Sequence, residues 1–378
     1  MWESLGLPKT LVKKNSIAVP VSQGDKGPMI AIRTMARSIL LVGIFAAAAA
    51  AAAPEALLVD IYGKVQIIGT DGATRVVTES MISAVFSRDG QNLAFTRRED
   101  SRAMDSPQVL SVISVNGGVA RQIARTESGK QFGSVGWLPD GSAIVFEGKD
   151  GHLFLAKLSL NEAPRDLGPW YQGFSISPDG LKIVHAVNAP VTGLEVLDVA
   201  SGRRTLIHKT SKVVWSAQFS PDGQWIAYEM TFRDPPKATD DEPDCTPPTI
   251  GLHVFSFRAN RDTAVRIAAP KDWDNVKSFS WSPDSKRLAV TVGTTDCDYP
   301  GSANGVFVTS LEHGAQSKVS NGDMAFDPVF SPDGSSLAYI DFSDPPAKLI
   351  RYDIATGSRT LIRRATQTDN FFRLLDWR

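Results

Sequence analysis

Short apolar runs separated by turn-forming residues recur from about residue 57 to the end of the chain. Runs such as 93–95, 226–228 and 337–339 each follow a turn that is rich in Ser, Pro, Asp and Gly. A second kind of hairpin then follows, with alternating apolar and polar residues as in 196–199 and 204–207. Alternation with a period of two is typical of strands, so the pattern predicts two hairpins, and therefore four strands, in each repeating unit.

One turn motif occurs six times. It consists of an apolar or aromatic residue followed in most copies by Ser-Pro-Asp-Gly, and the copies lie at 86–90, 137–141, 176–180, 219–223, 281–285 and 330–334. Proline presets φ, aspartate accepts hydrogen bonds from backbone amides ahead of it, and glycine tolerates a positive φ. The aspartates, at 89, 140, 179, 222, 284 and 333, are 39 to 62 residues apart, which is typical of the blades of a β-propeller.

The second hairpins outnumber the turn motifs by one. They lie near 64–78, 108–124, 151–168, 193–208, 250–268, 304–319 and 347–362. The first is preceded only by the apolar run 57–61, and the last is followed by 372–377, which resembles an innermost strand without its turn. We predict an all-β fold, a seven-bladed β-propeller of four-stranded blades. It is closed by pairing of the C-terminal strand with the N-terminal strands, which removes exposed sheet edges.

The repeated aspartates and aromatic residues favour structure over chemistry. A catalytic or metal role for the aspartates is the alternative, but the motif already gives each of them a turn to stabilise. A set of aromatic residues at equivalent positions is expected to fill the space between blades rather than to form an aromatic cage. This set comprises Phe86, Trp137, Phe219, Trp281, Phe330 and Trp377.

The first part of the chain has the composition of an export signal. Arg33 and Arg37 precede the apolar run 39–45 and eight alanines, Ala46 to Ala53. We expect 1–34 to be an upstream extension or a mis-assigned start, 35–52 to be a signal peptide, and 53–378 to be a single β-propeller domain. The apolar stretch is shorter than the roughly 20 residues of a membrane span, so we expect a periplasmic or secreted protein without stable membrane insertion; a retained anchor is the alternative.

Composition and charge exclude several classes of protein. Apolar residues make up 42% of the chain and charged residues 21%, which is typical of a globular protein. Forty basic and 41 acidic residues give a net charge of −1. Residues 1 to 38 hold six of the basic and two of the acidic residues, which leaves 34 − 39 = −5 for the remainder. A nucleic-acid partner is excluded, because it requires a basic face.

The six copies of Trp/Phe-Ser-Pro-Asp-Gly, followed by Ile/Leu-Ala-Phe/Tyr, resemble the TolB-like propellers of bacterial envelope proteins. The resemblance spans about residues 57 to 378. It implies a propeller that acts as a non-enzymatic binding module for another envelope protein or peptide. TolB itself carries an α/β domain before its propeller, whereas about 56 residues precede the blades here, so the binding partners of TolB are not carried over.

Enzyme signatures are absent from the sequence. It contains no Gly-x-Ser-x-Gly elbow, no His-Glu-x-x-His and no Walker loop. The histidines fall at differing places in their repeats, which predicts scattered structural roles: His152, His185, His208, His253 and His313. We predict no cofactor and no metal. The alternative is a propeller enzyme of the polysaccharide-lyase type, or a metal-dependent small-molecule enzyme, with a site on the propeller axis.

Loops between the second and third strands vary most, and variable loops on a rigid scaffold commonly carry recognition. The longest, 231–249, is acidic, and the loops that link one blade to the next open on the same face. We predict a face for a cationic or peptide partner with exposed aromatic residues as anchors; a solvated acidic loop is the alternative. The proposed face comprises Asp240, Asp241, Glu242, Asp244, Trp170, Tyr171 and Trp273.

The two cysteines, Cys245 and Cys297, fall in corresponding loops of consecutive blades, 297 − 245 = 52 residues apart. An even number of cysteines in an exported chain predicts a disulfide, provided that the Cα atoms come within roughly 7 Å. A reactive thiol pair and a soft-metal site are the alternatives. The expected protein is an exported monomer with one disulfide.

Overall fold

The structure is a computed structural model that describes residues 56–377, apart from 62–63, 70–72, 79–80, 149–150, 160–161, 171–172, 189, 234–248, 271–272, 274, 295–303, 313, 315 and 366–371. The chain divides into two compact units, 1–48 and 49–378, and all described residues lie in the second. The expected extension and signal peptide therefore lie outside the described residues.

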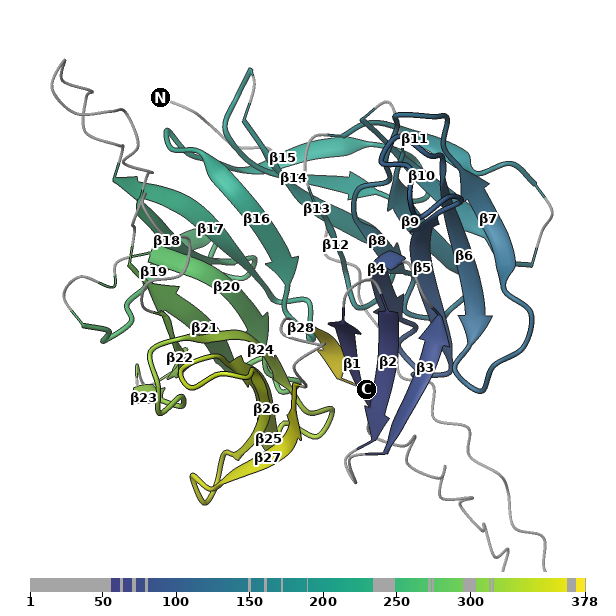
Figure 1. Ribbon diagram of the computed structural model, residues 1–378. Coiled ribbons are helices and arrows are strands. Elements are labelled where there is room, and N and C mark those ends of the chain that lie inside the picture. Colours follow the sequence, from purple (N-terminus) through teal and green to yellow (C-terminus); the bar gives the residue numbers. More distant parts are fainter. Residues whose placement is uncertain are drawn as a thin grey trace, which may run out of the picture. The chain divides into compact units, whose positions relative to one another are not determined.

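Six sheets are each built from four strands that follow one another in the sequence, with antiparallel neighbours (Figure 1). Their strands are β4 (Met81–Phe86), β5 (Asn92–Arg98), β6 (Gln108–Ser114) and β7 (Arg121–Arg125); β8 (Val135–Trp137), β9 (Ala143–Glu147), β10 (His152–Lys157) and β11 (Arg165–Pro169); β12 (Ser175–Ile176), β13 (Lys182–Val187), β14 (Gly193–Asp198) and β15 (Arg204–Lys209); β16 (Val214–Phe219), β17 (Trp225–Arg233), β18 (Thr249–Ser256) and β19 (Arg261–Val265); β20 (Asn275–Trp281), β21 (Arg287–Gly293), β22 (Asn304–Ser310) and β23 (Gln316–Lys318); and β24 (Ala325–Phe330), β25 (Ser336–Asp341), β26 (Lys348–Asp353) and β27 (Arg359–Arg364). The predicted all-β propeller of four-stranded blades is confirmed.

A further sheet combines strands from the two ends of the described chain, in the order β28-β1-β2-β3. Its strands are β1 (Ala56–Ile61), β2 (Lys64–Gly69), β3 (Thr74–Thr78) and β28 (Phe372–Trp377). β28 runs antiparallel to β1, with Leu57 opposite Trp377 and Ile61 opposite Phe372. The expected pairing of the C-terminal strand with the N-terminal strands is therefore present.

The six turn motifs lie at one end of the blades, which we call the turn end. In every copy with serine at the second position, the serine hydroxyl donates a hydrogen bond of 2.5–2.6 Å to the aspartate Oδ1. The same Oδ1 accepts the amide of the residue two positions further on, as Asp179 does from Leu181 at 3.0 Å. The Ser177 hydroxyl and this amide lower the pKa of Asp179. The structure thus confirms the turn role of the aspartates.

One turn departs from the motif without losing its shape. Ser285 takes the place of glycine and adopts a φ of 60°, close to the 70° of Gly223 and Gly334. Its hydroxyl accepts the backbone amide of Asp222 at 2.9 Å, which joins two neighbouring turns. Ser285 therefore adopts a left-handed backbone conformation that is uncommon for residues other than glycine, and its side chain forms a hydrogen bond between two blades.

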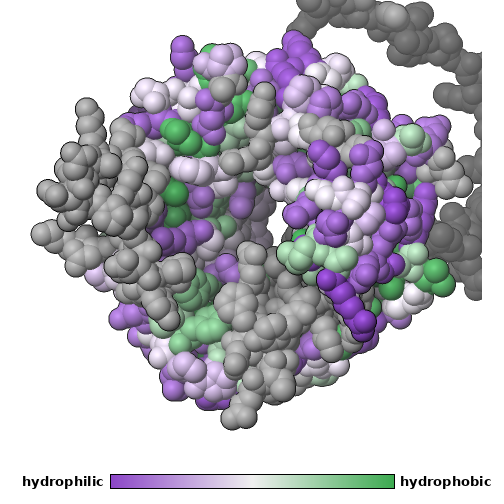
Figure 2. All heavy atoms as spheres, turned by 45° about the horizontal axis from the view of Figure 1, so that its top comes forward, coloured by the Kyte–Doolittle hydropathy of each residue, from purple (hydrophilic) through white to green (hydrophobic). Residues whose placement is uncertain are grey.

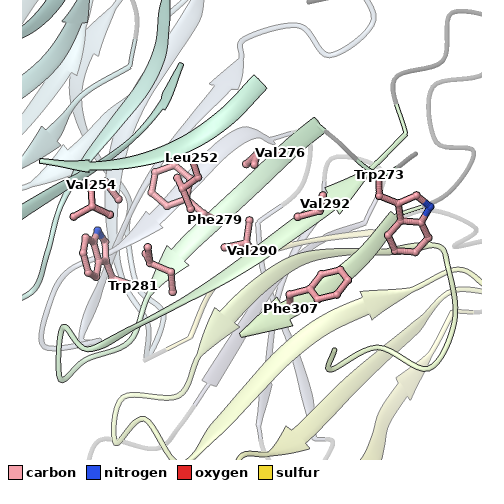
Figure 3. Packing of buried hydrophobic residues seen from close by; sticks show 11 residues of the cluster. Leu252, Val254, Trp273, Val276, Phe279, Trp281, Val290, Val292 and Phe307 are labelled. Atoms are coloured by element: carbon pink, nitrogen blue, oxygen red, sulfur yellow. The ribbon is translucent and has the colours of Figure 1, made fainter. Parts of the chain in front are cut away.

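The core lies between blades. All six repeated aromatic residues are buried. Trp137 donates from Nε1 to the carbonyl of Val85 at 3.1 Å, and Trp281 donates to the carbonyl of Gln218 at 3.4 Å, each reaching the preceding blade. Figure 3 shows one such layer, in which Trp281 and Phe279 of β20 face Leu252 and Val254 of β18. The predicted filling of the space between blades by aromatic residues is confirmed.

Candidate recognition surface at the loop end

We call the opposite end of the blades the loop end, because it carries the loops between second and third strands and the loops that link the blades. Figure 2 shows residues of the second unit arranged around a central opening. Each first strand begins at the loop end and runs toward its turn. The predicted recognition face belongs to this end.

Trp170 and Trp273 are not exposed anchors. Their side chains are only 3% and 9% exposed. Trp170 stacks on His185 with ring centroids 3.6 Å apart, and the Arg204 guanidinium lies 5.4 Å from its centroid. Trp273 meets Phe307 edge to face at 6.3 Å. The expectation was wrong because Trp170 packs between two blades and Trp273 packs against the blade that follows it, where each ring buries more apolar surface than it would in an exposed loop.

The rest of the predicted face lies outside the described residues. This applies to Tyr171, Asp240, Asp241, Glu242, Asp244, Cys245 and Cys297. The acidic part of the face and the disulfide therefore stay predictions.

Other apolar side chains are exposed at this end. Of the large hydrophobic residues that are exposed in the described part of the chain, more than half belong to the start of a first strand, the end of a second strand or a loop at the loop end. These residues are Ile82, Met104, Val213, Trp215, Phe232 and Met324. Single exposed apolar residues are ordinary, so only those that adjoin one another indicate a binding surface.

Three of these residues adjoin one another, and we call Val213, Trp215 and Phe232 the apolar patch. They are 42%, 39% and 64% exposed. Trp215 donates from Nε1 to the Thr231 hydroxyl at 3.2 Å, and the Thr231 amide donates to the Val213 carbonyl at 2.9 Å. Thr231 therefore joins Val213 to Trp215, and Phe232 is the next residue along β17.

A β-bulge explains why Trp215 faces outward. The pairing of β16 with β17 changes register between Val214 and Ser216, so Trp215 is the extra residue. An extra residue in one strand re-aims its side chain. The same shift occurs around Ile82 in β4 and around Lys277 in β20, so in three blades the bulge exposes one side chain at the loop end.

A partly buried carboxyl lies next to this bulge. Glu229 is paired with Ser216 across β16 and β17. Burial raises the pKa of Glu229 to about 7, although the Ser216 hydroxyl opposes the shift. Its charge therefore changes near neutral pH, one strand position from the apolar patch.

Three of the described histidines pair with a carboxylate of their own blade. His152 pairs with Asp166 at 2.9 Å, and His253 pairs with Asp262 at 3.1 Å. His185 pairs with Glu195 at 2.9 Å, and burial lowers the pKa of His185. Within the described ranges, no three residues among His, Cys, Asp and Glu are placed to hold a metal ion.

Comparisons with known proteins show the fold. No protein-family model matches the chain, and no curated protein matches it. TolB from Acinetobacter baumannii is 15% identical, covers 83% of this chain and 78% of its own, and gives a TM-score of 0.51. An oligogalacturonate lyase in complex with manganese is 16% identical, with 83% and 88% covered and a TM-score of 0.57. A prolyl endopeptidase is 13% identical, with 81% and 49% covered and a TM-score of 0.58.

These likenesses confirm the TolB-like propeller fold that the turn motifs predict. At such low identity they establish the fold and no activity. The part of the chain that the structure describes contains no helix long and apolar enough to cross a membrane.

Proposed function

We propose that this chain is an exported propeller that binds another envelope protein, or a peptide from one, through its loop end and without catalysing a reaction. The observation that carries the proposal is the apolar patch. Interface cores are enriched in large aromatic side chains, and hot spots are enriched in Trp. Trp215 is already held by Thr231, so little side-chain order remains to be lost when a partner binds.

The sequence around the patch suggests the character of the partner. Phe232 lies near the end of β17, and the carboxylates of Asp240, Asp241, Glu242 and Asp244 belong to the connection from β17 to β18. Apolar anchors beside acidic residues favour a partner segment that carries both apolar and basic side chains. Trp170 and Trp273 are buried, so they are not part of the proposed contact surface.

The remaining expectations complete the proposal. The sheet β28-β1-β2-β3 serves as the seventh blade of one closed ring. Residues 1–34 form an extension or a mis-assigned start, 35–52 form the removed signal peptide, and 53–378 act as a monomer in the periplasm or outside the cell. The likeness to an oligogalacturonate lyase is a likeness of fold only, so the enzyme alternative stays second.

Capture from an envelope extract tests the surface. The bait is residues 53–378, either unchanged or with Trp215→Ser and Phe232→Ser. A matched control carries Leu206→Ser and Leu361→Ser, which replace two side chains that are 40% and 48% exposed on the outer strands β15 and β27. We expect the patch variant to capture at least about tenfold less partner than the unchanged bait does. The control should capture as much partner as the unchanged bait. Equal capture by both variants would return the patch to ordinary surface.

The acidic loop is tested separately. Replacing Asp240, Asp241, Glu242 and Asp244 with Asn or Gln should reduce capture at low salt and matter less at high salt, because salt screens exposed charges. Unchanged capture at low salt would leave the loop as solvated surface.

The expected Cys245–Cys297 disulfide would present this loop with less ordering cost. Mass spectrometry of a non-reduced digest decides the matter, and two alkylatable thiols in periplasmically produced protein would reject the bond.

A further inference from the structure

A cleft of about 710 Å³ lies at the turn end, between the blade β8–β11 and the blade β12–β15. One wall comes from the turn and third strand of the first blade, and the other comes from the turns of the second. Its apolar lining comprises Leu138, Pro139, Leu155, Pro178, Leu181 and Val199. A volume of this size is ordinary for a binding site.

Leu138 departs from the repeat. In the other five turns this position is serine, whose hydroxyl donates to the aspartate, as Ser331 does to Asp333 at 2.6 Å, and accepts a backbone amide, as Ser331 does from Ser336 at 2.9 Å. Leucine makes neither bond. It places an apolar side chain in the cleft instead.

Leu181 departs from the repeat in the same way. The position that follows the turn is polar and exposed in the other five copies, at Gln91, Ser142, Gln224, Lys286 and Ser335. Leu181 is 58% exposed and lines the cleft. Leu181 thus adds an apolar side chain to the lining of the cleft, beside Leu138, at a position that is polar in the other five turns.

Lys157 is the third departure. In the other five blades whose four strands follow one another in the sequence, the last residue of the third strand is Ser or Asp. That residue accepts a hydrogen bond from a backbone amide of the following turn. Asp198 accepts the Ser201 amide at 2.8 Å, and Asp353 accepts the Thr356 amide at 2.7 Å. Lysine cannot accept a hydrogen bond. Lys157 is exposed, lines the cleft, and has no bonded partner among the described residues.

The charges at the rim define the occupant. Besides Lys157, the rim carries the Arg165 guanidinium, which donates to the carbonyls of Val199 and Ala200 and so holds the far wall in place. The acids are Glu162, which has no bonded partner in the described ranges, and the turn carboxylates of Asp140 and Asp179. An unpaired cation and an unpaired anion beside an apolar floor suit a ligand that carries both charges.

We propose that this cleft is a second binding site, for a short peptide segment of a partner protein with apolar side chains between an acidic and a basic residue. The apolar side chains contact Leu138, Leu181 and Val199, the acidic group pairs with Lys157, and the basic group pairs with Glu162. A fatty acid carries one charge and a neutral sugar lacks the apolar surface, so neither satisfies the whole lining. The site lies at the opposite end from the apolar patch and is independent of it.

The repeat itself supplies variants that are compatible with folding. Leu138→Ser, Lys157→Ser and Leu181→Gln each introduce a residue that stands at the equivalent position of another blade. The matched control carries Gln224→Ser and Lys286→Gln, which alter the same turn position in two blades away from the cleft. Thermal unfolding of every variant verifies that the fold is intact.

The probe is a set of fluorescein-labelled five-residue peptides with an acidic residue, three varied apolar residues and a basic residue, read by anisotropy. We expect wild type, the control, and the Trp215→Ser, Phe232→Ser variant to bind the same members of the set. The triple variant should bind them at least about tenfold more weakly. Peptides with serine in place of both charged residues should also bind more weakly.

Several results would overturn this site. They are no binding of any member to wild type up to about 1 mM, equal binding by the triple variant, equal binding of the charge-free set, or binding of dodecanoate in place of the peptides. Loss of binding in the Trp215→Ser, Phe232→Ser variant would transfer the peptide site to the loop end.

Discussion

The two ends of the blades use their side chains in opposite ways. At the turn end, serine, aspartate and backbone amides bond to one another within each motif, so most polar groups there are already occupied. At the loop end, a bulge in each of three blades exposes a different residue: Ile82, Trp215 or Lys277. Outside the cleft between the blades β8–β11 and β12–β15, the turn end therefore maintains the fold, and the loop end is free to vary and to acquire a partner.

The comparison assumes that the turn end and the loop end belong to one closed ring of blades. Removal of β28 tests this assumption, and it should have the largest effect on stability. Deleting Phe371 to Arg378 removes Leu374 and Trp377, which are buried against Ile68 and Leu349, and leaves the edge of β1 unpaired. We expect a loss of more than about 4 kcal/mol in the free energy of unfolding, or no folding at all. Urea unfolding measures it, and an unchanged midpoint would show that the ring is not closed there.

Removing a turn serine should cost stability without affecting partner capture. Ser331 is fully buried, and its hydroxyl accepts the Ser336 amide. Ser331→Ala should lower the free energy of unfolding by about 2 kcal/mol, because a buried amide loses its acceptor. The exposed Ser335→Ala is the control and should change stability by less than about 0.5 kcal/mol. If Ser331→Ala also abolished capture, the two ends would not be separable.

Glu229 should make the stability of the loop end depend on pH. Its pKa is raised from 4.5 to about 7 in the folded state, so the folded protein retains a proton that the unfolded chain releases. Stability therefore falls as the pH rises from about 4.5 to about 7 and stays lowered above it. Between pH 5 and pH 8, the free energy of unfolding should therefore fall by about 2 kcal/mol less in Glu229→Gln than in the unchanged protein. Urea midpoints at both pH values check this, and identical slopes for the two proteins would reject it.

The smallest effect on stability is expected at the apolar patch. Phe232→Ser changes a side chain that is 64% exposed, so the free energy of unfolding should change by less than about 0.5 kcal/mol while capture falls. Trp215→Ser also removes the hydrogen bond to the Thr231 hydroxyl, so a loss of about 1 kcal/mol is expected. Thermal unfolding measures the stability of each variant, and the capture assay measures partner binding on the same samples. A large loss of stability would mean that the patch belongs to the core rather than to a recognition surface.

The sequence was sufficient for the fold because the turn motif carries its own physical cause. Proline, aspartate and a left-handed residue mark each turn, and the neighbouring apolar positions give the strands on both sides. The sequence contains one second hairpin more than it contains turn motifs, and this excess predicted the pairing of β28 with β1.

The recognition surface was harder to predict, because exposure depends on packing between blades. Trp170 and Trp273 lie in connections, where an aromatic residue suggests exposure, yet each packs against the blade that follows it. Trp215 lies in a strand, where an aromatic residue suggests core, yet a register shift turns it outward. A single extra residue hardly changes the alternation of apolar and polar residues along one strand, so the sequence pattern did not reveal that Trp215 is exposed.

The pairing of Leu57 with Trp377 makes the order of the blades in the chain arbitrary. Trp377 ends an innermost strand and Leu57 lies near the start of its neighbour, so the two residues stand one strand spacing apart at the position of the missing turn. Joining them through Ser-Pro-Asp-Gly and two further residues would reproduce the connection that runs from Phe219 to Ile226. The chain could then be opened instead in a loop between any two blades, as a circular permutant with the same sheets and a different first blade.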